Sequence, residues 1–452
     1  MNAVSTARET GLWKRGVLWL LVLGPLFFAS YGFANWLTAQ RDDVGSLVFA
    51  WESQTPLWAW TIVPYWSIDL LYGLSFLLPV SRREMDRHAL RLLSTQLLCV
   101  ACFLLWPLRF TFERPALEGT FGLMFDVLMG FDKPFNQAPS LHIALLVVIW
   151  VMFARHTHGP WLRGLLHGWM ALIGVSVLTT WQHHFIDVPT GVLAGWLCVW
   201  LWPIEGRSPL LAARPAKMAK RWRLALRYAF GAALCVAIAA NVAGIALWLL
   251  WPAVALLLVA LNYALVGAEG FQKQADGRLT QAVNWLFAPY LLGAWLNSRL
   301  WTRRQPAPSE IVPGIWLGRL PDAKQLQGFA AVVDLCAELP LNTQGKAYRS
   351  IPVLDLTAPT VDDCLQAATA IEALRQRGPL LVCCALGYSR SACTVAAWLL
   401  LYGGGKDVDD VLQRIRQARP QIVLSDAHQQ VLSALRQLPA QAPIAQEVAH
   451  GL

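Results

Sequence analysis

The chain has 452 residues, of which 56% are hydrophobic and only 14% are charged, and it contains 23 tryptophans. This composition excludes a protein that is soluble throughout, and tryptophan favours membrane interfaces. The net charge of +9 does not indicate nucleic-acid binding, because many cations fall in short segments between apolar runs and no basic stripe carries aromatic platforms. The apolar excess ends near residue 300, which predicts a polytopic helical membrane region followed by a soluble tail.

Apolar runs predict six membrane-spanning helices in the first half of the chain. They lie at about 16–37, 57–80, 89–110, from near 140 to 155, 164–180 and 186–204. The positive-inside rule places the basic segments in the cytoplasm and the neutral or acidic ones on the opposite side. The basic segments are 1–15, 81–88, 155–163 and 205–223, and the others are 39–56, 111–138 and 181–185. Asp69 lies inside the second run, where a carboxylate is expected to pair with a cation, face a wet cavity or serve a function.

Two further spans are expected in residues 225–266, with a turn near Asn241 and Gly244. Residues 279–298 have basic flanks and polar interruptions, which favours an interfacial or re-entrant helix over a ninth span. The predicted domains are therefore 1–222, 223–304 and a cytoplasmic tail at 305–452.

The tail alternates between strand and helix patterns, which predicts an α/β domain. Strands are expected at 315–318, 331–335, 349–354 and 380–383, and helices at 361–376, 392–402 and 407–418.

Polar residues gather at three predicted span ends on the side away from the cytoplasm. His183 and Asp187 are four residues apart at the start of a helix, so the carboxylate can orient the imidazole. That imidazole could attack phosphorus while His142 protonates the leaving group and Arg114 neutralises phosphate charge. His184 is expected to be only a hydrated interfacial side chain.

This part of the chain, about residues 15–205, resembles the type-2 phosphatidic acid phosphatase superfamily. The shared motifs are Arg114-Pro115, Pro139-Ser140-Leu141-His142 and Ser176 with His183 and Asp187. The resemblance implies that His183 is the nucleophile, Asp187 its partner and His142 the general acid. Pro107 and Val177 replace a Lys and an Arg of the motifs, which is closer to the lipid phosphotransferase branch and is also compatible with a degenerate site.

In the tail, a buried strand runs into Cys384-Ala385-Leu386-Gly387-Tyr388-Ser389-Arg390-Ser391 and then into a helix. A loop of this length can surround one phosphate with backbone N–H groups and the positive end of the helix. That environment favours a thiolate nucleophile at Cys384. Arg390 is expected to grip two phosphoryl oxygens, and Ser391 to donate to the sulfur as it leaves.

The tail, about residues 308–440, resembles the cysteine-dependent dual-specificity phosphatases, although Cys383 stands where that family has His. The resemblance implies a phosphate cradle at Ala385, Leu386, Gly387, Tyr388 and Ser389. It also implies an aspartate on an upstream loop that protonates the leaving oxygen. Asp355 matches that position, and Asp362 and Asp363 are rivals.

The sequence therefore predicts a bacterial inner-membrane enzyme that fuses the two phosphatase families. Its tail should hydrolyse phosphomonoesters, with lipid phosphates favoured because a tethered site meets headgroups at high effective concentration. The alternatives are a membrane-tethered tyrosine or serine phosphatase, and a membrane part that is a lipid phosphotransferase or a degenerate lipid-binding anchor. No metal or other cofactor is expected, and the several free thiols fit a reducing compartment.

Overall fold

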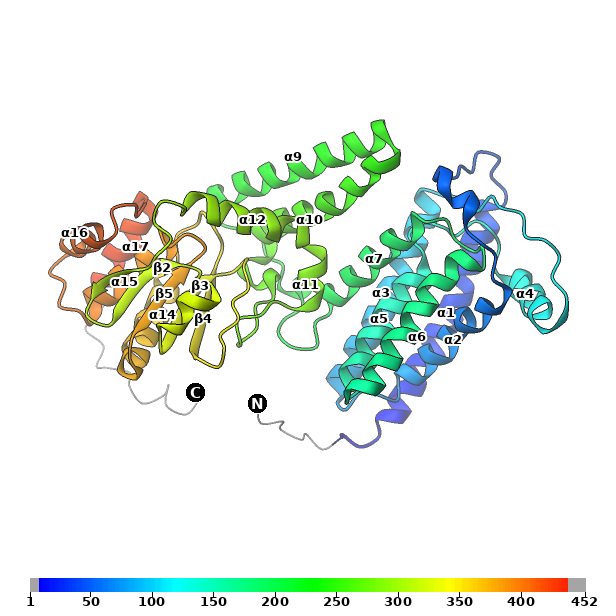
Figure 1. Cartoon of the computed structure of the whole chain (residues 1–452), viewed down its shortest axis with the longest axis horizontal. Coiled ribbons are helices and arrows are strands. Elements are labelled where there is room, and N and C mark those ends of the chain that lie inside the picture. The colour runs from blue at the N-terminus through cyan, green and yellow to red at the C-terminus, as the bar shows by residue number, and fades with distance from the viewer. Residues whose placement is uncertain (1–7, 438–452) are drawn as a thin grey trace. The chain divides into compact units, whose positions relative to one another are not determined.

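The computed structural model describes residues 8–437, so the ends of the predicted basic N-terminal segment and of the tail, 1–7 and 438–452, lie outside it. The chain divides into two compact units, Met1–Leu211 and Ala212–Leu452 (Figure 1).

The N-terminal unit is helical. Its main helices are α1 (Leu12–Thr38), α2 (Ile62–Ser75), α3 (Arg82–Leu105), α4 (Gly119–Phe131), α5 (Leu141–His156), α6 (Pro160–Thr179) and α7 (Asp187–Leu201). A helix, α4, therefore lies within the segment 111–138 that was expected to be a loop, and the residues on either side of it are irregular. Three of these helices, α1, α3 and α6, are long and apolar enough to cross a membrane by length and composition, whereas α2, α5 and α7 are shorter.

The C-terminal unit begins with helices that precede the α/β domain. They are α9 (Ala219–Val242), α10 (Leu250–Leu261), α11 (Gln281–Leu286) and α12 (Ala288–Trp301). The segments Ala219–Val242 and Gly244–Val266 are again long and apolar enough to cross a membrane. The turn between them lies at Ala243 and Gly244, both with positive φ, as expected. Residues 281–301 form two short helices that meet at Phe287, next to Pro289 in the first turn of α12.

A five-stranded sheet forms the centre of the α/β domain. Its strands are β1 (Ser309–Val312), β2 (Ile315–Arg319), β3 (Ala331–Cys336), β4 (Ala347–Val353) and β5 (Leu380–Cys384), in the order β1-β2-β5-β3-β4. Only β1 is antiparallel to its neighbour. The central strands β3 and β5 are buried along their whole length, which explains their continuous apolar sequences.

The two faces of the sheet have different covers. Leu380, Val382 and Cys384 of β5 face a core shared with the helices α14 (Val361–Leu374), α15 (Arg390–Leu401), α16 (Val408–Ala418) and α17 (Asp426–Arg436). Leu381 and Cys383 face the opposite core, which includes α13 (Ala323–Gln327) and Ala294 of α12. Side chains alternate along a strand, so Cys383 and Cys384 point to opposite faces.

Candidate active site

The loop between β5 and α15 surrounds the sulfur of Cys384. The backbone N–H of Gly387 donates to Sγ at 3.2 Å, and the hydroxyl of Ser391 donates to it at the same distance. The Cys384 side chain is buried at the end of β5, and α15 begins at Arg390. The sulfur therefore sits where backbone N–H groups and a helix N-terminus favour negative charge.

Gly387 allows the loop to close tightly. Its φ is +72°, and a Cβ at this position would lie 2.3 Å from the carbonyl carbon of Gly318 on β2. A side chain fits neither the backbone conformation nor the space.

Arg390 is held from the side of the sheet. Its two terminal nitrogens, Nη1 and Nη2, each donate to one carboxylate oxygen of Glu338 at 2.8 Å, and Nη1 also donates to the carbonyl of Val353. Burial alone would lower the pKa of Arg390, but Glu338 and Asp355 raise it well above its ordinary value. The guanidinium is thus a fixed, permanent charge beside the thiol loop.

Asp355 follows β4 and accepts a hydrogen bond from Arg390 Nη2 at 2.9 Å. Burial raises the pKa of its carboxyl; Arg390 opposes this, and Glu338 adds to it. A carboxyl that retains its proton is suited to act as a general acid.

The two rival aspartates have local roles. Asp363 accepts from the backbone and side chain of Thr360 in the capping box of α14, and Asp362 accepts from Gln366 one turn later. Of the three candidates, Asp355 is the one that forms an ion pair with Arg390 among the described residues.

Further hydrogen bonds and a ring contact fix the rest of the loop between Cys384 and Arg390. Arg419, fully buried, donates to the carbonyl of Gly387 at 3.0 Å and to that of Leu386 at 3.4 Å. Ser389 donates to the carbonyl of Val423, and the Arg419 guanidinium lies over the Tyr388 ring. Arg419 therefore fixes the carbonyls of Leu386 and Gly387, and a loop held by its carbonyls can present its N–H groups to an anion.

Residues that precede the α/β domain also hold its active-site loops. Ser298 of α12 donates to the carbonyl of Ala385 at 2.5 Å, and Tyr263 donates to the carbonyl of Asp355 at 2.9 Å. Lys273, buried, reaches Asp334 of β3 at 2.5 Å and the carbonyl of Leu339 at 2.8 Å. Three loops of the site, around Ala385, Asp355 and Glu338, are therefore attached to the apolar helical segment.

Sequence reasoning missed Glu338 and these outer contacts. Glu338 lies two residues beyond the end of β3, and functional side chains gather at the carboxyl ends of parallel strands, so its position was a usable signal. Arg419, Tyr263, Lys273 and Ser298 carried no such signal, because each acts on a loop that is distant in the sequence.

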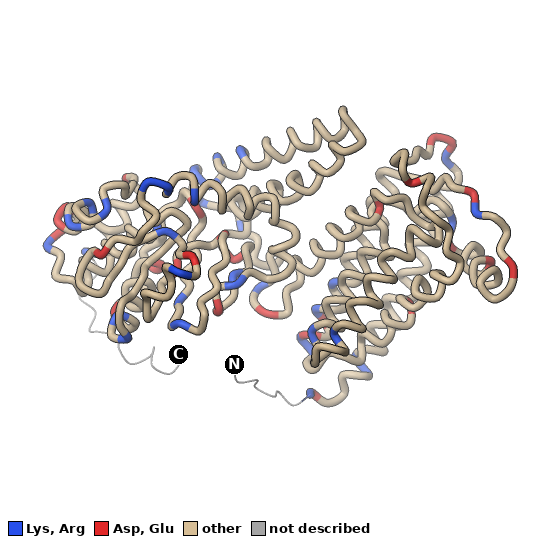
Figure 2. The backbone as a smooth tube through the Cα atoms, viewed as in Figure 1, with Lys and Arg blue, Asp and Glu red and all other residues tan. Residues whose placement is uncertain are grey.

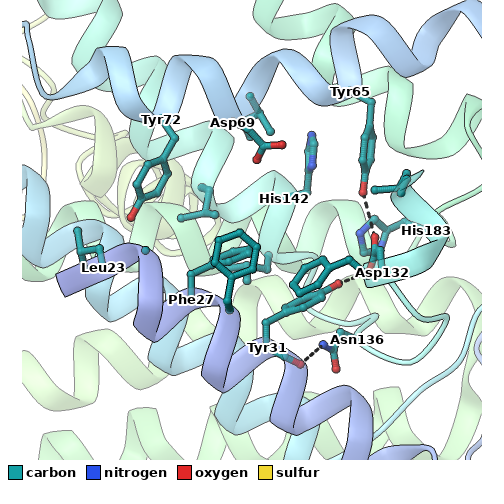
Figure 3. A pocket seen from close by; sticks show the side chains of 17 residues that line it. Leu23, Phe27, Tyr31, Tyr65, Asp69, Tyr72, Asp132, Asn136, His142 and His183 are labelled. Carbon is teal, nitrogen blue, oxygen red and sulfur yellow. Dashed lines mark hydrogen bonds between the residues drawn. The ribbon is translucent and has the colours of Figure 1, made fainter. Parts of the chain in front are cut away.

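A second group of candidates lies in the N-terminal unit. His183 Nδ1 is 3.1 Å from Asp187 Oδ2, and His183 Nε2 is 3.0 Å from the hydroxyl of Ser140. His142 stacks on Tyr65, with ring centroids 4.2 Å apart, and lines the same cavity as His183 (Figure 3). The structure therefore brings His142, His183 and Asp187 together.

Arg114 is not part of that cavity. It donates to the carbonyls of Thr180 and Trp181 and lies over the ring of Phe125. His184 is also not a hydrated surface side chain: it is buried, and its Nδ1 lies 3.0 Å from Glu52 Oε2. Glu52, far away in the sequence, was not a candidate partner.

The family model of the dual specificity phosphatase catalytic domain matches residues 315–437. The C-terminal unit therefore contains a phosphatase domain of this class, whose members hydrolyse phosphate esters. The structure of Tk-PTP in its active form is similar at 28% identity over 30% of this chain and 99% of that one, with a TM-score of 0.28.

Human DUSP28 is similar at 24% identity over 28% of this chain and 94% of that one, with a TM-score of 0.27. PTPMT1 in complex with PI(5)P is similar at 19% identity over 28% of this chain and 94% of that one, with a TM-score of 0.27. The comparison with curated proteins gives no match.

Proposed function

We propose that the chain is a membrane-bound phosphatase that hydrolyses lipid phosphomonoesters through a phosphocysteine at Cys384. The Cys384 thiolate attacks phosphorus, the ester P–O bond breaks, and Asp355 gives its proton to the departing oxygen. Water then attacks the phosphocysteine while the Asp355 carboxylate takes a proton from that water. The S–P bond breaks, Ser391 donates to the leaving thiolate, and inorganic phosphate is released.

The observation that carries the lipid assignment is the attachment of the catalytic loops to apolar helices. Ser298 holds the phosphate loop at Ala385, and Tyr263, at the end of a segment long enough to span a membrane, holds the loop at Asp355. A site fixed in this way would work at the bilayer surface, where lipid headgroups are concentrated.

Charge around the first turns of α9 supports the same proposal. Six cations and no acidic residue lie between residues 214 and 227 (Figure 2). They are Arg214, Lys217, Lys220, Arg221, Arg223 and Arg227. Such a basic segment next to a span attracts anionic lipid and favours the cytoplasmic side of an inner membrane, which is where we place the phosphatase domain.

The test compares substrates on the full chain in nanodiscs. An aryl phosphate should be hydrolysed, and Cys384→Ser should abolish that hydrolysis. Phosphatidic acid and phosphoinositides in the bilayer should then be turned over faster than tyrosine- or serine-phosphorylated peptides. Preference for peptides would replace the lipid assignment with that of a tethered protein phosphatase.

A second candidate function is phospholipid chemistry at His183 in the N-terminal unit. The bond from Asp187 orients the His183 ring, and Nε2 faces Ser140 in a cavity that also holds His142. We infer that His183 Nε2 attacks the phosphorus of a phospholipid on the side of the membrane away from the phosphatase domain. The P–O bond to the leaving alcohol breaks and His142 protonates that oxygen; water or a second alcohol then attacks phosphorus, the N–P bond breaks, and His183 is released. Loss of a lipid product in His183→Ala, with aryl phosphatase activity intact, is the expected result; an unchanged lipid profile would reduce this unit to an anchor.

A further inference from the structure

The cavity beside His183 has mostly aromatic walls. Its volume is about 410 Å³, and it is lined by residues of α1, α2, α4 and α5, of the segment that follows α4, and by His183. Six phenyl or phenol rings line it: Phe27, Phe28, Tyr31, Tyr65, Tyr72 and Phe131 (Figure 3). Several of these rings pack on one another, with Tyr31 stacked on both Phe27 and Phe131.

The charged groups on these walls are negative. Asp69 and Asp132 line the cavity, and no Lys or Arg is among its 17 lining residues. Asp132 accepts hydrogen bonds from Tyr31 at 2.5 Å and from Tyr65 at 3.4 Å. Within residues 8–437, neither carboxylate forms an ion pair with a basic side chain.

This arrangement disfavours a phosphomonoester as the ligand. A dianion in this cavity would face two carboxylates with no guanidinium on the cavity wall. The positive charge of Arg114 acts on Asp132 from outside the wall, where its guanidinium donates to the carbonyls of Thr180 and Trp181. A cation has the opposite preference. The faces of aromatic rings attract ammonium groups, most strongly where water is excluded, and carboxylates supply the counter-charge.

We propose that this cavity binds the ammonium group of a zwitterionic lipid headgroup, with Asp69 and Asp132 as its counter-ions. Tyr65, Tyr72 and the other rings of the lining would surround the ammonium substituents. In such a headgroup a phosphodiester lies a few bonds from the ammonium group, so the phosphate can reach His183 and Ser140 while the net charge entering the cavity is zero. The proposal names zwitterionic phospholipids as the substrate class of the His183 site. Its chemical step rests on the function proposed for His183, whereas headgroup binding does not.

The test is lipid photo-cross-linking on the full chain in nanodiscs. Two probes with the same diazirine-bearing acyl chain are compared, a phosphatidylcholine and a phosphatidylglycerol, and the labelled peptides are identified by mass spectrometry. The quaternary ammonium of choline is charged at every pH. We expect the choline probe to label the segments around α1, α2 and α4 about five- to tenfold more than the glycerol probe, the range for one close cation partner.

The variants separate charge from packing. Asp132→Asn and Asp69→Asn keep the shape of the side chain and should each reduce choline labelling several-fold without reducing glycerol labelling. Asp126→Asn, an exposed acid on α4, is the matched control and should change neither. An unchanged elution profile and unchanged labelling by the glycerol probe show that the N-terminal unit of a variant is folded. If one aspartate variant fails to fold, the other decides the test.

Equal labelling by the two probes, a preference for the glycerol probe, or unchanged selectivity in both aspartate variants would overturn the proposal. Free choline in excess should compete little if the site takes a lipid headgroup; full competition would assign it to a soluble amine instead. His183→Ala separates binding from chemistry: it should keep the choline preference even if lipid turnover disappears. If the chain still converts phospholipids but labels the two probes equally, the proposed choline headgroup is rejected and the function proposed for His183 stands.

Discussion

Glu338 holds Arg390 through two parallel hydrogen bonds of 2.8 Å, and both side chains are almost completely buried. Burial alone would raise the pKa of Glu338, but the charge and hydrogen bonds of Arg390 lower it below its ordinary value. The carboxylate is therefore ionised throughout the neutral range. It occupies both terminal nitrogens of the guanidinium and fixes the plane of the Arg390 side chain.

Replacing Glu338 with Gln should impair both catalysis and stability. The guanidinium loses its buried counter-charge, which costs about 3–5 kcal/mol when one partner of a buried pair is removed, and its orientation loosens. We expect kcat for an aryl phosphate to fall about 100-fold, the cost of a small misplacement of a catalytic group. The matched control is Glu372→Gln, whose pair with Arg375 is partly exposed to solvent and should matter by less than about 1 kcal/mol. Equal effects of the two variants in thermal unfolding and kinetics would contradict the role assigned to Glu338.

The pH dependence should follow Asp355. Because burial raises the pKa of this carboxyl, it remains protonated to a higher pH than an ordinary aspartate. Hydrolysis of alkyl phosphates, whose oxygen leaves poorly, should decline as the pH rises through that pKa. Asp355→Asn should remove this alkaline limb and slow alkyl phosphates about 100- to 10,000-fold, with a much smaller effect on an activated aryl phosphate. A limb that survives in the variant would assign the proton to another group.

The phosphate loop was predictable because its chemistry is contiguous in the sequence. Cys384, Gly387, Arg390 and Ser391 fall between a buried strand and a helix, and local rules for strands and helix N-termini are sufficient to assemble them. The strands and helices around them were found within a few residues for the same reason. The edge strand β1 and the helices α13 and α17 were not predicted, because they are short or gain stability mainly from packing on the rest of the domain.

The partners of the loop were not predictable, because they depend on tertiary contacts. Nothing near Lys273 in the sequence indicates that it meets Asp334, 61 residues later, in a buried position. The surroundings of Cys383, which stands where the dual-specificity phosphatases have His, also became visible only in the fold. This side chain is buried on the face away from the Cys384 core, where burial raises the pKa of its thiol well above the ordinary value.

The closed form of the phosphate loop should not tolerate a side chain at residue 387. Gly387→Ala would place Cβ 2.3 Å from the Gly318 carbonyl carbon in a left-handed backbone conformation, so the loop must move away from β2. We expect kcat/KM to fall more than about 100-fold. Gly404→Ala is the control, since Gly404 has a similar φ of +68° but no atom near its Cβ position. Gly404→Ala should cost only about 1–2 kcal/mol of stability and leave kcat/KM unchanged. Comparable losses of kcat/KM in the two variants would show that backbone strain, and not the contact with Gly318, is responsible.

The buried pair of Lys273 and Asp334 should connect the helical segment to the stability of the phosphatase domain. Burial alone would lower the pKa of Lys273, but Asp334 raises it above the ordinary value, so the amine is charged. Tyr348 and the backbone N–H of Cys336 complete the hydrogen bonds of Asp334. Lys273→Met leaves this carboxylate buried and unpaired, at a cost of about 3–5 kcal/mol.

Heat inactivation of aryl phosphatase activity in the full chain measures this effect. The midpoint should fall by several degrees in Lys273→Met, and the double variant Lys273→Met with Asp334→Asn should recover part of the loss, because no unpaired charge then remains. Lys324→Met, at an exposed position on α13, should leave the midpoint unchanged. No recovery in the double variant would mean that the hydrogen bonds of Lys273 to the carbonyls of Cys336 and Leu339 stabilise the loop more than its charge does.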